Sequence, residues 1–88
     1  MVTEITLNDA FGLYQSELER EMVGLTQSDR LIKRFMVYSP TVKRTVALSL
    51  VDLIREIQNR TELGKVKVVE YVQQLTDSKG EPLYIIKT

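Results

Sequence analysis

The chain contains no cysteine and no histidine among its 88 residues. Without cysteine, no disulfide can stabilise the fold, and cysteine usage gives no indication of the redox compartment. Without histidine, the usual general base and a common ligand of transition metals are also missing. Neither a GxxxxGK[ST] phosphate loop nor a GxGxxG motif occurs, because the four glycines are scattered singly. We therefore expect no catalytic site, no metal site and no cofactor, and we expect that the protein is not an enzyme.

Long apolar runs are missing as well. No run approaches the length of a membrane span, and residues 1–6 show no basic stretch followed by an apolar core. A cytoplasmic protein without membrane contact is the expectation. The length allows one domain, residues 1–88, which buries only about 60 to 65% of its unfolded surface and is marginally stable. Since no disulfide is available, self-association is the remaining means of stabilisation, and we expect a homo-oligomer, namely a dimer.

Charge is balanced overall but unevenly distributed. The 12 basic and 12 acidic side chains give a net charge of zero. Residues 1–29 hold six acids and one base, whereas residues 30–60 hold seven bases and two acids. This pattern is compatible with a mutually neutralised surface, or with a basic surface that an acidic first helix partly masks.

Apolar residues at spacings of three and four predict a first helix over about residues 7–24. Its stripe consists of Leu7, Phe11, Tyr14, Leu18, Met22 and Leu25. Thr6 or Asn8 can cap the start of this helix, and Gly24 can end it. A second, shorter helix is expected over about residues 27–37, with its own apolar face.

The longest predicted helix covers about residues 40–63. Ser39 and Pro40 are typical of a helix start, because the serine oxygen can accept from free amides and proline is tolerated in the first turn. The apolar stripe contains Val42, Val46, Leu50, Leu53, Ile54 and Ile57. Leu48 falls on the opposite side, and Gly64 can end the helix. Such a helix needs partners on more than one side.

The segment 65–75 is ambiguous. Its β-branched and aromatic residues favour a strand: Val66, Val68, Val69, Tyr71 and Val72. Periodicity favours a helix, because all of these except Tyr71 then share one broad face. Residues 83–86 read more clearly as a strand, since they follow a turn segment that contains Gly80.

Two architectures follow from this ambiguity. The favoured one is an α+β, mostly helical fold in which the three helices pack on a C-terminal β-hairpin of about residues 66–75 and 82–87. Gly80 then supplies a positive φ in the connecting loop. The alternative is an all-α helix-turn-helix, formed around a turn at residues 61–64, with a helix over 65–75 and a rudimentary wing. In both, a terminal strand that is apolar on both faces favours pairing across a dimer.

Five basic residues cluster in the sequence around the Ser39–Pro40 turn: Arg30, Lys33, Arg34, Lys43 and Arg44. A helical hairpin with a basic second helix is one arrangement that binds DNA. We therefore expect a small, non-enzymatic, nucleic-acid-associated regulatory protein that acts as a dimer and whose binding weakens steeply with salt. The zero net charge argues against this function.

The alternative function is a protein-protein interaction module without nucleic-acid binding, such as an adaptor, an inhibitor or a small assembly subunit. Its contact surface would use apolar residues that the predicted helices leave without partners: Leu48, Tyr71, Tyr84 and Ile86. The two functions predict opposite effects of mutation. Substituting Lys43 and Arg44 should abolish nucleic-acid binding alone, whereas Leu48→Lys should abolish protein binding alone.

Overall fold

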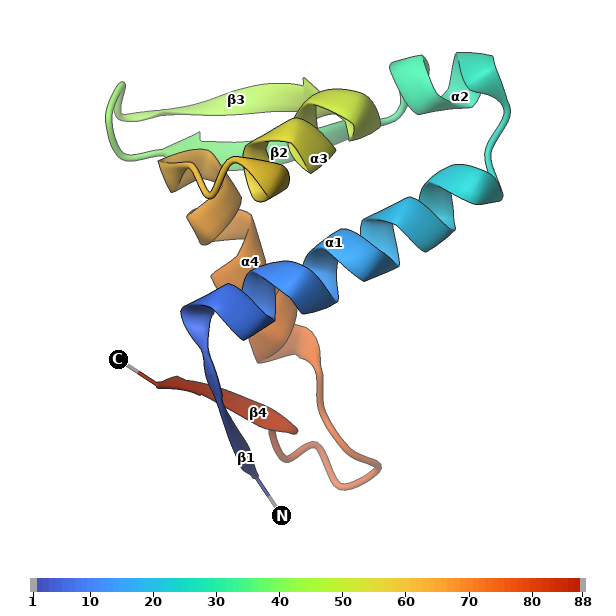
Figure 1. Ribbon diagram of the computed structural model, residues 1–88. Coiled ribbons are helices and arrows are strands. Elements are labelled where there is room, and N and C mark those ends of the chain that lie inside the picture. The colour runs from blue at the N-terminus through green and yellow to red at the C-terminus, as the bar shows by residue number, and fades with distance from the viewer. Residues whose placement is uncertain (1, 88) are drawn as a thin grey trace.

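The computed structural model describes residues 2–87, which form helices at the centre and a pair of strands at each end (Figure 1). In chain order the elements are β1 (Thr3–Thr6), α1 (Leu7–Val23), α2 (Gln27–Ile32), β2 (Arg34–Ser39), β3 (Arg44–Ser49), α3 (Leu50–Gln58), α4 (Glu62–Gln74) and β4 (Tyr84–Lys87). β2 pairs with β3, and β1 pairs with β4. The predicted α+β, mostly helical class is confirmed. The all-α alternative is wrong because of these two strand pairs.

The first helix has the predicted bounds and caps. Thr6 Oγ1 accepts a hydrogen bond from the backbone N–H of Asp9 at 3.0 Å, and the Asp9 carboxylate accepts one from the Thr6 N–H at 3.4 Å. This reciprocal pair satisfies two free donors at the start of α1, and Gly24 caps the other end. Thr26 Oγ1 caps α2 by accepting a hydrogen bond from the Asp29 N–H at 3.2 Å, but α2 stops at Ile32. The predicted helix over residues 27–37 is therefore wrong beyond this point, where β2 follows.

The predicted helix over residues 40–63 is wrong in its first half, and it also ends earlier than predicted, because α3 stops at Gln58 and a separate helix, α4, begins at Glu62. Residues up to 49 form the β2–β3 hairpin, and the helix α3 begins only at Leu50. Val46 and Leu48 are half-buried while Thr45 and Ala47 are exposed, which is the period of two that a strand requires. The true helix start is Ser49, whose Oγ accepts from the Asp52 N–H at 3.1 Å. The stripe of apolar spacings in this region was therefore shared between a strand and a helix.

The helix α4 covers Glu62–Gln74, so the predicted strand over residues 66–75 and the C-terminal hairpin are wrong. Periodicity outweighed β-propensity, because Val68 and Val72, one turn apart, are both buried in the core. The predicted last strand is confirmed as β4, but it pairs in parallel with β1, with Ile5 opposite Ile86. In the loop before β4, Gly80 has the predicted positive φ, at 82°.

The core lies where α1, α3 and α4 meet. Its buried residues are Ala10, Phe11, Tyr14, Leu18, Leu50, Leu53, Ile54, Ile57, Val68 and Val72. The prediction that Gly64 ends a helix is wrong, because Gly64 lies in the first turn of α4, against α3. A Cβ at this position would be 2.5 Å from the carbonyl oxygen of Glu56, so only glycine permits the close approach of the two helices. Within residues 2–87, no helix has the length and apolar character needed to cross a membrane.

Candidate functional site

The β2–β3 hairpin lies within the basic region of the chain, residues 30–60. Its strands pair antiparallel, from Arg34 opposite Ser49 at one end to Ser39 opposite Arg44 at the tip. Ser39 Oγ accepts a hydrogen bond from the Val42 N–H at 3.4 Å across the turn. The serine and proline that were predicted to start a helix thus form a chain reversal, for which the same residue types are suited.

One face of the hairpin, the inward face, packs against the helices. Its residues are Phe35, Val37 and Ser39 of β2, with Val46 and Leu48 of β3; the register also places the exposed Arg44 on this side, opposite Ser39 at the tip. Phe35 lies beside two ammonium groups, because its ring centroid is 5.3 Å from Lys33 Nζ and 6.0 Å from Lys67 Nζ. Lys67 belongs to α4 and also pairs with Glu70 at 3.1 Å. These contacts attach the inward face to α4.

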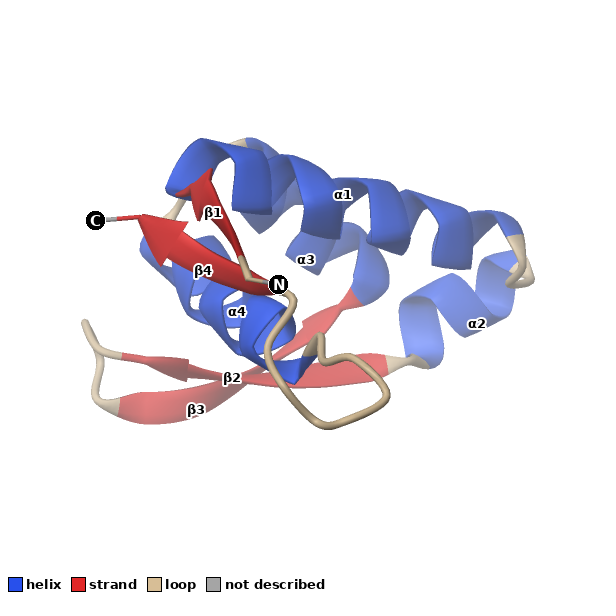
Figure 2. Ribbon diagram, turned by 90° about the horizontal axis from the view of Figure 1, so that it is seen from below, coloured by secondary structure: helices blue, strands red, loops and turns tan. Residues whose placement is uncertain are grey.

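The opposite face of the hairpin is uncovered, and Figure 2 shows α1, α3 and α4 on the other side. We call its five residues the outward face: Arg34, Met36 and Tyr38 of β2, with Thr45 and Ala47 of β3, all exposed. Met36 is 60% exposed and Tyr38 is 52% exposed. Met36 lies opposite Ala47, and Tyr38 opposite Thr45. The outward face therefore has a central apolar and aromatic strip with a guanidinium at one end.

Three of the predicted basic residues have no ionic partner among the described residues. Lys43 and Arg44 lie at the hairpin tip, and Arg34 lies at the far end of β2. Five residues of extended strand separate the two positions, a distance of about 17 Å. Residues 33–49 hold four basic side chains and no acidic one. The hairpin therefore carries a positive charge that its own residues do not neutralise.

The other two predicted basic residues are engaged within the protein. Arg30 Nε donates to the backbone carbonyl of Met22 at 2.9 Å. The Lys33 ammonium pairs with the carboxylate of Glu21 on α1. The five residues are thus not a single cluster, because the hairpin separates them. The acidic helix α1 therefore neutralises part of the basic charge near α2. This agrees with the interpretation that an acidic first helix partly masks a basic surface.

The residues predicted as a protein interface are all half-buried against the core: Leu48, Tyr71, Tyr84 and Ile86. Tyr71 stacks on Tyr14 with 4.5 Å between the ring centroids. The exposed apolar residues are others, among them Met36, Tyr38 and Ile85. Exposure alternates over residues 34–39 in the structure, but residues 35–38 are all apolar or aromatic, so the sequence alone does not separate Met36 and Tyr38 from their less exposed neighbours.

The tyrosine pair lies away from the hairpin and has a structural role. Burial raises the pKa of Tyr14 to about 12, and the negative charges of Glu70 and Glu21 act in the same direction. Burial also raises the pKa of Tyr71, with Glu17 contributing next. Both tyrosines therefore stay neutral at physiological pH and stabilise the contact between α1 and α4.

The part of the chain that the structure describes holds no group of three or more acidic residues that could bind a metal ion. Comparison with protein-family models, with curated proteins and with solved structures finds no match for the chain. The geometry and charge of the hairpin are therefore the observations that bear on function.

Proposed function

We propose that this is a non-enzymatic DNA-binding regulatory protein of the cytoplasm, and that the β2–β3 hairpin is its contact surface. One observation carries the proposal: a basic hairpin without acidic residues exposes a whole face that no other element covers within the described residues. The fold differs from the helix-turn-helix surface expected from the sequence, but Arg34, Lys43 and Arg44 keep the role proposed for them.

The dimensions of the hairpin are compatible with duplex DNA. The major groove of B-form DNA is wide enough to admit a two-stranded β-ribbon. Arg34 and the pair at the tip lie at opposite ends of the ribbon, about 17 Å apart, so they could contact phosphates at either end of a ribbon that lies in the groove. Tyr38 and Met36 between them would then face the base edges. The deep and narrow major groove of duplex RNA offers no such access to side chains.

A second candidate function uses the same surface for a protein partner. The centre of the outward face is apolar, because Met36 and Ala47 lie opposite each other and Tyr38 is beside them. This observation favours an interaction module more than it favours phosphate binding. The two candidates differ in their dependence on salt, since phosphate contacts release counterions and apolar contacts do not.

The test is fluorescence anisotropy with a labelled duplex DNA of random sequence, measured over a series of salt concentrations. Three phosphate contacts per hairpin predict that log K falls with log salt at a slope of about −3. The double variant Lys43→Ala, Arg44→Ala should lower the affinity and reduce the slope to about −1. The matched control removes two bases elsewhere, Arg20→Ala and Lys79→Ala, and should leave both quantities nearly unchanged.

Duplex RNA of the same length is the comparison ligand and should bind more weakly. Absence of DNA binding even at low salt would refute the proposal. Binding that depends equally on the control bases would refute the assignment to the hairpin. In the first case, the apolar outward face leaves the protein-interaction module as the remaining candidate.

A further inference from the structure

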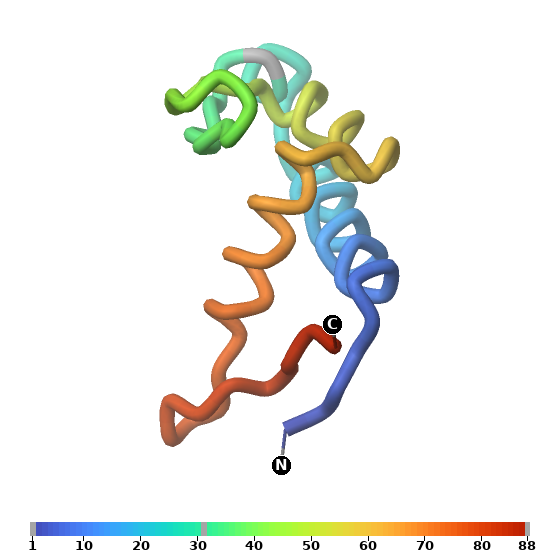
Figure 3. Tube along the Cα trace, turned by 90° about the vertical axis from the view of Figure 1, so that its left-hand side faces the viewer, coloured from blue at the N-terminus to red at the C-terminus, as the bar shows by residue number. Residues whose placement is uncertain are grey.

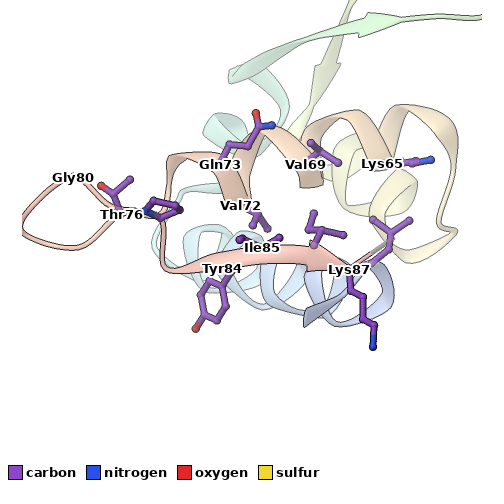
Figure 4. A pocket seen from close by; sticks show the side chains of 12 residues that line it. Lys65, Val69, Val72, Gln73, Thr76, Gly80, Tyr84, Ile85 and Lys87 are labelled. Atoms are coloured by element: carbon purple, nitrogen blue, oxygen red, sulfur yellow. The ribbon is translucent and has the colours of Figure 1, made fainter. Parts of the chain in front are cut away.

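A second exposed feature lies at the opposite end of the molecule from the hairpin. A groove of about 790 Å³ runs between α4 and β4, and most of its surface is apolar. Val69 and Val72 line the α4 side, and Pro82 and residues 84–87 line the other side. Figure 4 shows Lys65 and Lys87 at one end of the groove, with Thr76 and Gly80 at the other. No acidic residue lines it.

The groove exists because the strand pair is narrower than the helices that cover it. β1 and β4 form a sheet of only two strands, so along β4 itself one edge has no strand beside it in the described chain; just before β4, Thr76 pairs with Pro82 in an isolated antiparallel bridge. α1 contacts both strands, whereas α4 contacts β4. Figures 2 and 3 show α4 on the side of β4 that is away from β1. Two-stranded sheets are marginal alone, and parallel ones are normally buried.

We propose that the groove is filled by β4 of a second copy of this chain. The two β4 strands pair antiparallel about a two-fold axis, which gives a four-stranded sheet in the order β1, β4, β4, β1. Each α4 then covers the strand that its partner supplies, and Val69 packs on that strand. A closed, two-fold pairing leaves no free edge on β4 for further growth.

The charges at the two ends of β4 match this occupant. Lys87 is at the end of the strand and Glu81 precedes its start. Antiparallel pairing therefore brings Glu81 of the second copy to the end of the groove that holds Lys65 and Lys87. None of these three side chains has an ionic partner within the described residues. The two-fold axis repeats the attraction at the other end.

The register follows from the burial of alternate residues. Tyr84 and Ile86 are half-buried on one face, while Ile85 is 51% exposed on the other. The half-buried face of one β4 continues into the half-buried face of the other when Ile85 lies opposite Ile85 of the second copy and Tyr84 lies opposite Ile86. Lys87 is then diagonal to Glu81, a spacing that long side chains can bridge.

This register makes a sharp test possible because the chain has no native cysteine. Directly opposite residues of antiparallel strands have Cα atoms about 4.5 to 5.5 Å apart, within the range that a disulfide spans. Ile85→Cys should therefore form a covalent dimer under mild oxidation. Leu83→Cys is the matched control, because its two copies would be offset by four residues and should not cross-link. Equal cross-linking of both variants, or of neither, would overturn the register.

The oligomeric state is measured by light scattering at about 100 µM chain, where a dimer with a micromolar dissociation constant is populated. Val69→Arg places a charge in the groove and should give a monomer, whereas Val23→Arg, at a site that is 81% exposed, should remain dimeric. Circular dichroism confirms that both variants are folded. A monomeric parent chain, or a dimer that Val69→Arg leaves intact, would overturn the proposal.

Charge exchange gives an independent measurement on surface variants that should fold. Glu81→Lys or Lys87→Glu alone should raise the dimer dissociation constant at least about ten-fold, because each reverses an attraction at two symmetric sites. The double variant should recover most of the affinity. If the double variant instead loses affinity by the sum of the two single effects, Glu81 and Lys87 do not pair across the dimer. The inference does not depend on DNA binding, since the monomeric Val69→Arg variant retains its hairpin and should still bind DNA.

Discussion

Gly64→Ala is the substitution for which the structure predicts an effect opposite to the usual one. In an open helix, replacing glycine by alanine stabilises by about 0.5 to 1 kcal/mol. At position 64 the added Cβ would lie 2.5 Å from the Glu56 oxygen and 3.0 Å from its carbonyl carbon. Both atoms belong to the backbone of α3, so relief requires α4 to move away by roughly 1 Å, at the typical overpacking cost of about 1 to 3 kcal/mol. We expect a net loss of about 1 to 2 kcal/mol.

The matched control is Gly12→Ala in the middle of α1. A Cβ there would meet nothing within 4 Å, so this substitution should stabilise the protein by about 0.5 to 1 kcal/mol. Urea unfolding followed by circular dichroism measures both variants, and the two should shift the midpoint in opposite directions. Stabilisation by Gly64→Ala of the same size as by Gly12→Ala would refute the close approach of α3 and α4.

Three further substitutions test the helix ends and the tyrosine pair. Ser49→Ala should lower the free energy of unfolding by about 1 kcal/mol in urea unfolding, because it removes the N-cap of α3; Ser78→Ala, in an exposed loop, should have little effect. Arg60 donates to the Ile57 carbonyl at 2.8 Å and to Asn8 Oδ1 at 3.1 Å, so Arg60→Ala should cost about 1 to 2 kcal/mol, and no change would contradict these contacts. The raised pKa of Tyr14 favours the folded state below pH 10, and this contribution is lost as the pH rises towards 12. Alkaline unfolding should therefore show a fall of about 2 to 3 kcal/mol between pH 10 and 12 that is absent from Tyr14→Phe.

The helices whose caps and periodicity agree were predictable from the sequence. In α1, Thr6, Asp9 and Gly24 give local signals that all indicate the same bounds, and the structure follows them. The prediction of a long helix over residues 40–63 is wrong in its first half because two local signals conflict at residues 39–49. Ser39 and Pro40 suit a turn as well as a helix start, and Leu48 fitted no helical face.

The remaining differences between the prediction and the structure depend on contacts between residues that are distant in sequence. The parallel pairing of β1 with β4 joins residues more than 75 positions apart, for which no local pattern exists. Residues 66–75 have strand propensity but form a helix, since that places Val68 and Val72 in the core beside α1 and α3. The five basic residues are neighbours in the sequence only, because the hairpin separates Arg34 from Lys43 and Arg44, and the other two have partners within the protein.

The most direct test of the proposed function is an NMR titration of the protein with duplex DNA. If the hairpin binds DNA, backbone and side-chain signals of the outward face and the hairpin tip should shift first, notably those of Tyr38, Lys43 and Arg44. Signals from residues 84–87, at the other end of the molecule, should not respond. Shifts centred on the groove between α4 and β4, or no shifts at low salt, would contradict the assignment of the hairpin as the DNA-binding surface.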